Sequence, residues 1–230
     1  MGVTTVIDRI RARAHWDIAI RPEPFRSDLV AYDRLEEILN QAVVRLRGWP
    51  VPFVDNREPV LRGQDWIGQN IDARVLPHME AWRFFTSGQF AQLRVVSADL
   101  RAGTETTPMN ADGASIIEVW EILFYLTEVV ELAARLALGN AGGEQMTIET
   151  RLHGVENRLL VAGTSSRELV GDYRATMSSI EEMRTEQREH LLAESRQIAV
   201  EMAREMFLRF GFKAPEQVLA DYQRELTEGR

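Results

Sequence analysis

The residues with the clearest potential for chemistry lie in the first half of the chain, where His78 and Glu80 form a His-x-Glu pair. This spacing occurs in zinc deaminases, in which the histidine binds the metal and the glutamate transfers protons. Those sites also need a pair of cysteines, and this sequence contains none. A hydrolase that used His78 and Glu80 as a general acid–base pair would still lack a nucleophile or a metal. The sequence therefore specifies no catalytic residue and no metal site.

Other catalytic and cofactor motifs are missing as well. Without cysteine the chain cannot form disulfides, Cys-ligated zinc sites or iron–sulfur centres. Its single lysine, Lys213, does not follow the glycine-rich run of a phosphate-binding loop, and no Gly-x-Gly-x-x-Gly occurs. The run from Gly163 to Arg167 lacks the second glycine of a serine-hydrolase elbow. We therefore expect no cofactor, and the sequence favours a binding protein over an enzyme.

Arginine and tryptophan are concentrated between residues 45 and 90, and four of the five tryptophans lie between residues 16 and 82. A guanidinium group forms forked hydrogen bonds to carboxylates and phosphates, whereas an indole stacks on planar rings. Both side chains are also over-represented among the residues that dominate protein interfaces. The candidate binding residues are Arg45, Arg47, Trp49, Trp66, His78, Glu80, Trp82, Arg83, Ser87 and Gln89.

Two interpretations of this region need no small ligand. In the first, the tryptophans pack irregular chain against the core, and the arginines pair with Asp55, Asp65 and Glu80. In the second, the region is an interface for a partner protein or for a second copy of the chain. The apolar stripes Tyr32/Leu35/Leu39 and Val218/Tyr222/Leu226 are further candidate contacts for such a partner.

The third interpretation is a sensor or enzyme for a nucleotide or nucleic-acid end, with Arg47 and Arg83 on phosphate and Trp49 or Trp66 stacked on the base. The formal net charge of −8 disfavours nonspecific binding to phosphate backbones. Residues 1–101 nevertheless hold 14 arginines against 13 acidic residues, so a local arginine-rich face remains open as an interpretation.

Three stretches of the chain resemble a module of bacterial proteins: Arg47-Gly48-Trp49-Pro50-x-Pro52, Gly63-Gln64-Asp65-Trp66-Ile67, and Glu80-x-Trp82-Arg83-Phe84-x-x-Ser87-Gly88-Gln89-Phe90. In some of those proteins the module accompanies a nucleic-acid-binding or ATPase region of the Schlafen-like or AlbA type. The match covers roughly residues 15–100 and brings no established activity, so it implies no catalytic residue. It implies an accessory subunit of a bacterial multi-component system such as anti-phage defence.

Hydrophobic periodicity predicts an α+β fold, with an antiparallel sheet built from hairpins and packed by about three long helices. Strand-like alternation marks residues 15–21, 80–96 and 146–161, the latter two as hairpins, whereas residues 171–187 fit either a strand or a helix. Helical patterns cover residues 27–48, 115–138 and 189–210 and a short stretch after Pro215. Ser115 and Glu118 form a capping box at the start of the second of these helices. Residues 101–113 are predicted to form a polar loop.

The chain reads as a single α+β domain over residues 1–230. Residues 15–100 form its Trp/Arg-rich half, with an irregular segment at 49–79, and residues 101–230 form an acidic, helix-rich half. Charged residues interrupt the longest apolar run, so we expect a cytoplasmic protein with no membrane contact. Its expected function is that of a non-enzymatic subunit that binds a protein partner, or a second copy, through the Trp/Arg-rich surface.

Overall fold

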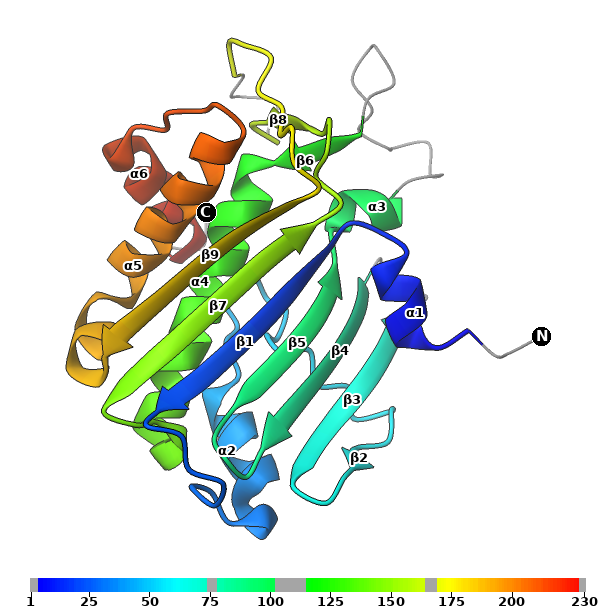
Figure 1. Cartoon of the computed structure of the whole chain (residues 1–230), viewed down its shortest axis with the longest axis vertical. Helices are drawn as coiled ribbons and strands as arrows, with labels where there is room; N and C mark the ends of the chain where they lie inside the picture. The colour runs from blue at the N-terminus through cyan, green and yellow to red at the C-terminus, as the bar shows by residue number, and fades with distance from the viewer. Residues whose placement is uncertain (1–3, 74–77, 102–114, 164–168, 228–230) are drawn as a thin grey trace.

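The computed structural model describes residues 4–73, 78–101, 115–163 and 169–227, and its main feature is a seven-stranded sheet. The strand order is β2-β3-β4-β5-β1-β7-β9, so the first strand in the sequence, β1, lies inside the sheet (Figure 1). Neighbouring strands are antiparallel throughout, which confirms the predicted fold class. The strands are β1 (His15–Glu23), β2 (Leu61–Arg62), β3 (Trp66–Ala73), β4 (His78–Phe85), β5 (Phe90–Val95), β7 (Gln145–His153) and β9 (Ser179–Gln187).

Helices cover one face of this sheet. Figure 1 shows α2, α4, α5 and α6 behind the sheet, whereas α1 lies on the near side and packs Ile10 against Met79, Ala81 and Val95. None of the helices in the described ranges is long and apolar enough to cross a membrane. The helices are α1 (Val6–Arg11), the 3₁₀ turn η1 (Tyr32–Arg34), α2 (Leu35–Ala42), α3 (Ser97–Arg101), α4 (Val119–Leu136), the π-helical η2 (Ala137–Ala141), α5 (Arg188–Arg209) and α6 (Glu216–Thr227).

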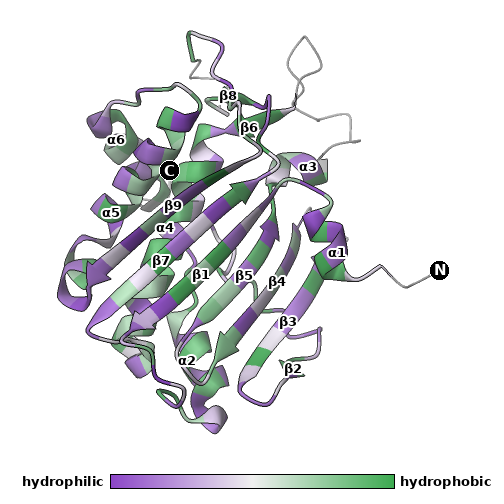
Figure 2. Cartoon of the chain, in the orientation of Figure 1, coloured by the Kyte–Doolittle hydropathy of each residue, from purple (hydrophilic) through white to green (hydrophobic). Residues whose placement is uncertain are grey.

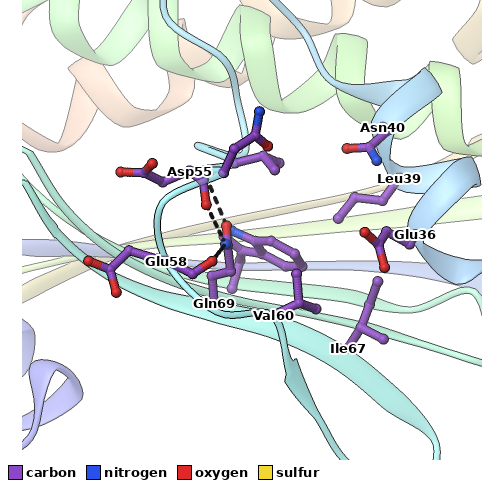
Figure 3. Close-up of a pocket in the computed structure, with 11 residues that line it drawn as sticks. Glu36, Leu39, Asn40, Asp55, Glu58, Val60, Ile67 and Gln69 are labelled. Atoms are coloured by element: carbon purple, nitrogen blue, oxygen red, sulfur yellow. Dashed lines mark hydrogen bonds between the residues drawn. The ribbon is translucent and has the colours of Figure 1, made fainter.

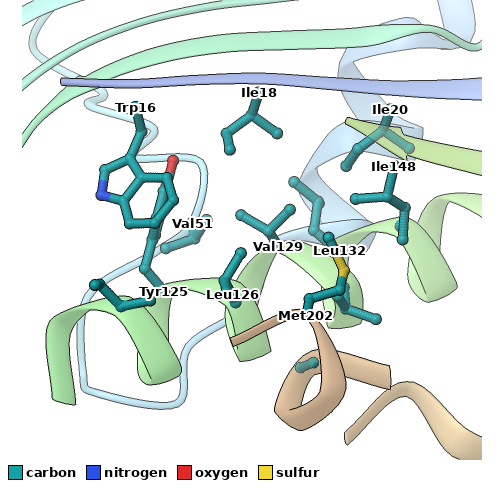
Figure 4. Close-up of a cluster of buried hydrophobic side chains, with 14 of the residues drawn as sticks. Trp16, Ile18, Ile20, Val51, Tyr125, Leu126, Val129, Leu132, Ile148 and Met202 are labelled. Carbon is teal, nitrogen blue, oxygen red and sulfur yellow. The ribbon is translucent and has the colours of Figure 1, made fainter. Parts of the chain in front are cut away.

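The core lies between the sheet and α4. Side chains of a strand alternate between its two faces, so every second residue of β1 points to the helices. Trp16, Ile18 and Ile20 occupy these positions and meet Leu126 and Val129 of α4 (Figure 4). Helix α4 is buried on nearly every side because α2, α5 and α6 also pack against it. Each large apolar side chain that is fully buried here contributes about 1.5–3 kcal/mol of transfer free energy.

Charged and polar side chains of β1 and β7 lie on the other face of the sheet, and Figure 2 shows that hydrophilic and hydrophobic residues are mixed along the strands. Arg21 and Arg151 form ion pairs with Glu149 at 2.7 and 2.5 Å. At the opposite end of the same two strands, the imidazole rings of His15 and His153 stack with their centroids 4.7 Å apart. Hydrophilic residues on this face therefore satisfy one another across strands.

Two predicted helix boundaries are wrong. The helix expected to run to Gly48 ends at Ala42, because Val43 takes an extended conformation and Val44 pairs with Val51 through two backbone hydrogen bonds. The expected capping box before α4 does not form, since the N-cap of that helix is Glu118, whose side chain makes no capping hydrogen bond.

The second predicted hairpin is also wrong. Strand β8 (Leu159–Val161) does not pair with β7 but runs parallel to β6 (Ile116–Glu118), in a separate two-stranded sheet. The ambiguous stretch before α5 is the edge strand β9. The polar loop expected at 101–113 lies almost entirely outside the described residues.

We predict that Phe84→Ala lowers the free energy of unfolding by about 3–5 kcal/mol, because Phe84 is fully buried on the helix-facing side of β4. Phe85→Ala is the matched control, since Phe85 is the next residue, points to the open face and is only half-buried. Urea unfolding of both variants should show a loss for Phe85→Ala of less than half that for Phe84→Ala. Equal losses would contradict the assignment of the two faces.

We also predict a pH dependence from the histidine stack. Burial lowers the pKa of His15 below 6.5, and the neighbouring His153 acts in the same direction. Because the unfolded chain then binds protons more readily than the folded one, His15 favours folding above about pH 6.5 and opposes it as the pH falls below that value. Unfolding midpoints measured from pH 7.5 to 5.5 should fall more steeply for the wild type than for His15→Gln. Identical slopes would show that His15 is not responsible.

Candidate functional site

The backbone of Phe53, in the irregular segment, is held by two side chains from the helix-facing side of β4. Its N–H donates to the Glu80 carboxylate at 2.9 Å, and its carbonyl accepts from Trp82 Nε1 at the same distance. The second oxygen of Glu80 lies 2.8 Å from His78 Nε2. His78 and Glu80 are thus in contact, as a pair two residues apart on one strand face allows, and the fully buried carboxylate is satisfied by structural partners.

A third side chain, Gln69 of β3, holds the next turn of the segment. Its Nε2 donates to the carbonyls of Asp55 and Glu58 at 2.8 and 2.9 Å, and its Oε1 accepts from the N–H of Asp55 at 3.1 Å. Gln69 is buried, so these bonds replace the secondary structure that the segment lacks. The sequence did not identify Gln69, because residues 49–79 were expected to be irregular throughout. That expectation is wrong for β2 and β3, which lie within this range, and β3 places Gln69 on the helix-facing side of the sheet.

A pocket of about 170 Å³ lies between this segment, α2 and the end of β3 (Figure 3). Its acidic rim is already paired, since Glu36 contacts Arg62 at 2.9 Å and Asp55 contacts Arg57 at 2.8 Å. The volume is below the roughly 300 Å³ that pockets for drug-sized ligands usually have. The lining residues are Glu36, Leu39, Asn40, Val54, Asp55, Asn56, Glu58, Val60, Ile67, Gln69 and Trp82.

The two arginines expected to hold one phosphate lie on opposite faces of the sheet. Arg47 forms a two-pronged ion pair with the fully buried Glu128 of α4, on the helix side. Arg83 lies on the open face, 4.7 Å from the ring of Trp66, and donates to Asn70 at 2.8 Å. In this fold a single small ligand cannot contact both guanidinium groups.

Neither arginine has the partners expected from the sequence. Asp55 pairs with Arg57 instead, and Glu80 binds the backbone of Phe53. The true partner of Arg47 is 81 residues away in the sequence, beyond the reach of any local pattern.

The remaining candidate residues are spread over the molecule. Trp49 and Arg45 are exposed in the loop between Val44 and Val51, whereas Ser87 is buried in the turn between β4 and β5 and Gln89 is half-buried there. The two apolar stripes proposed as partner contacts are wrong for most of their members, because the core of the chain itself buries Leu35, Leu39, Tyr222 and Leu226.

The sequence missed a polar cluster inside the core, around Tyr125 of α4. The Tyr125 hydroxyl donates to Gln92 Oε1 at 2.8 Å, and its ring lies 4.6 Å from the guanidinium carbon of Arg94 and 5.1 Å from the ring of Trp16. Burial raises the pKa of Tyr125 well above 10, so the hydroxyl keeps its proton. Burial acts to lower the pKa of Arg94, but Tyr125 and nearby carboxylates outweigh it, and the pKa is raised overall.

The sequence did carry a signal for this cluster. Strand β5 places Phe90, Gln92 and Arg94 on one face, and that face pairs with Ile20, Ile18 and Trp16 of β1. Two polar residues in register with an apolar stripe indicate either a buried network or a binding site.

No family model matches the chain, and no curated protein or solved structure matches it either. The resemblance to the bacterial module therefore stays a prediction. Within the described ranges, no three histidine, aspartate or glutamate side chains are placed so that they could hold a metal ion.

We predict that Gln69→Leu lowers the free energy of unfolding by about 1–3 kcal/mol, because it leaves buried backbone groups of the segment without hydrogen-bond partners. Hydrogen exchange at the amide of Asp55 should accelerate, since that N–H donates to Gln69. Asn70→Ala is the control, because Asn70 lies on the open face and its side chain accepts a hydrogen bond from Arg83. Unchanged exchange in Gln69→Leu would show that the segment is held by other contacts.

Proposed function

We propose that the chain is a binding subunit that engages a protein partner through a surface centred on Trp49. The observation that carries this proposal is the exposure of Trp49, a residue that is 42% accessible although tryptophan is highly buried on average. Large aromatic side chains that stand out from a folded surface favour burial against another molecule.

The loop that carries Trp49 is held in place on both sides. Val44 and Val51 exchange backbone hydrogen bonds of 2.9 and 2.8 Å, which close the loop at its base. Arg47 ties the loop to Glu128 in α4. A side chain presented on a held loop loses little conformational entropy on binding, so more of its contact energy is available for affinity.

The surroundings of Trp49 have the composition of an interface. Its ring lies 6.3 Å from that of Phe53, and Arg45 is exposed on the same loop. Tryptophan and arginine are the residues most enriched among interface hot spots. We call Arg45, Trp49 and Phe53 the Trp49 surface. The bacterial multi-component setting of such a partner, anti-phage defence included, rests on the sequence resemblance alone.

The alternative of a nucleotide or nucleic-acid end is supported by one observation, the stacking of Arg83 on Trp66 on the open face. Such a platform accepts a planar base. It is weaker as a proposal because Arg83 already donates to the carbonyls of Gln69 and Trp82 and to Asn70. The net charge of −8 also opposes the approach of a polyanion.

We predict that Trp49→Ala weakens partner binding by about 30-fold or more, the effect of losing a contact worth about 2 kcal/mol. The chain is co-expressed with the products of its neighbouring genes, and the masses of the complexes are measured by native mass spectrometry across a dilution series. Phe25→Ala removes another exposed aromatic, 62% accessible, and should leave binding unchanged. A chain that remains a monomer and captures none of these proteins, or a Trp49→Ala variant that binds like wild type, would refute the proposal.

A further inference from the structure

Arg94 has an unusual position inside the molecule. It points from β5 toward α4, in register with the fully buried Trp16, yet its side chain is partly accessible. Among the described residues, its guanidinium group forms no ion pair and no hydrogen bond, and its contact is with the ring of Tyr125 at 4.6 Å. A partly accessible guanidinium group without a carboxylate partner is available to bind a further anionic group.

Three more polar atoms near Tyr125 lack hydrogen-bond partners. They are Trp16 Nε1, Gln92 Nε2 and Glu121 Oε2, all on side chains that are at most 2% exposed. In the described residues, five buried side-chain atoms are without a partner, and these three belong to one neighbourhood. Buried polar groups are paired in the large majority of cases, so a cluster of exceptions marks a place where a bound molecule completes the bonding.

The contacts of Tyr125 bring these groups together. Gln92 accepts its hydroxyl hydrogen at 2.8 Å, the ring of Trp16 lies at 5.1 Å, and Glu121 precedes it by one helical turn on the same side of α4. The side chains of Trp16, Gln92 and Arg94 therefore contact Tyr125, and Glu121 lies one turn away on the same side of its helix.

The nearby carboxylates decide which charge the site accepts. Glu80 is bonded to His78 and to the backbone of Phe53, and Glu128 to Arg47, so neither neutralises Arg94 directly. Glu121 uses one oxygen to accept from the N–H of Ser97 at 2.6 Å and keeps the other free. Arg94 and the half-free Glu121 carry opposite charges, so together they suit a ligand that has both an anionic group and a hydrogen-bond donor. The surrounding carboxylates oppose a dianion such as phosphate.

We propose that Arg94, Gln92, Trp16 and Glu121 form a binding site for a small molecule that carries one carboxylate and one hydrogen-bond donor, of the amino-acid or hydroxy-acid class. The carboxylate binds the forked guanidinium of Arg94 and accepts from Gln92 Nε2. The ammonium or hydroxyl group of the same molecule donates to the free oxygen of Glu121. This site lies inside the core and is independent of the Trp49 surface.

The test uses the full chain and four small probes, with thermal unfolding and the fluorescence of Trp16 as readouts. Glycine and glycolate, which carry both groups, should raise the unfolding midpoint and change the emission. Acetate, which carries the carboxylate alone, should act more weakly, and inorganic phosphate should have no effect. If neither glycine nor glycolate acts, the site holds only water and the proposal fails; a response to phosphate as large as that to glycine would refute the charge argument.

Substitutions distinguish a binding role of Arg94 from a structural one. Arg94→Met should abolish the response to glycine and leave the unliganded midpoint unchanged or higher, because it removes an unpaired charge from the interior. Arg83→Met, on the open face, is the control and should keep the full response. A lowered midpoint together with an intact response in Arg94→Met would show a structural role and overturn the proposal.

A second variant keeps the test decisive if Arg94→Met does not fold. Gln92→Leu preserves the approximate shape of the side chain and removes the donor, and it should weaken glycine binding by about tenfold, which corresponds to the loss of one hydrogen bond to a charged group. Wild-type affinity in Gln92→Leu would overturn the assignment of the site.

Discussion

Hydrogen bonding by side chains of β3 and β4 is the interaction on which the rest of this structure depends. The chain between Pro52 and Val60 lies over the helix-facing side of the sheet without forming a helix or a strand, so the regular ladder of a helix or sheet does not satisfy its backbone N–H and C=O groups. Gln69, Glu80 and Trp82 supply hydrogen-bond partners instead. Polar side chains at core positions are therefore part of the architecture, and the segment from Phe53 to Glu58 takes its position from them.

The sheet separates two chemical environments. On the helix side, charged groups are few, buried and individually bonded, as Glu128 is to Arg47. On the open side, charges are numerous and exposed and form shared ion pairs such as those of Glu149. Pairs of the second kind add little stability because water screens them, whereas loss of one partner of a buried pair leaves an uncompensated charge. Arg94 is the exception on the helix side, because it has no carboxylate partner, and this is the reason to propose that it binds a ligand.

The sequence predicted the fold class because its signals were local. Alternation over β1 and the turn between Phe85 and Phe90 specify strands and a hairpin without knowledge of distant residues. The sequence predicted the wrong C-terminal end for α2, because the pairing of Val44 with Val51 overrides the helical periodicity of the residues after Ala42. Where a helix ends is thus decided here by a tertiary contact that periodicity does not show.

The candidate site was harder to predict for the same reason. Sequence patterns grouped Arg47 with Arg83, but the two lie on opposite faces of the sheet. Arg47 pairs with Glu128 on the helix side, whereas the alternation of β4 turns Arg83 to the open face. The patterns marked His78 and Glu80 as a His-x-Glu motif, and the structure brings the two side chains into contact because residues two apart on a strand share a face. The cluster around Tyr125 joins side chains from β1, β5 and α4, and one sequence alone contains no information on how these elements meet. Composition therefore indicated which residue types are unusual here, while their grouping came from the tertiary structure.

The central place of β1 has a consequence for how this protein forms during its synthesis. Its partners, β5 and β7, are made much later, and His15 finally pairs with His153. At ribosomal rates of about 5–20 residues per second, the interval between the synthesis of β1, with Trp16, Ile18 and Ile20, and that of β7 is on the order of ten seconds. Until then the side of β1 that pairs with β7 has no partner strand and α4 is only just complete, and such a delay exposes the strand to aggregation and to chaperones. The order of the strands thus makes completion of the core a late, cooperative event that requires both halves of the chain.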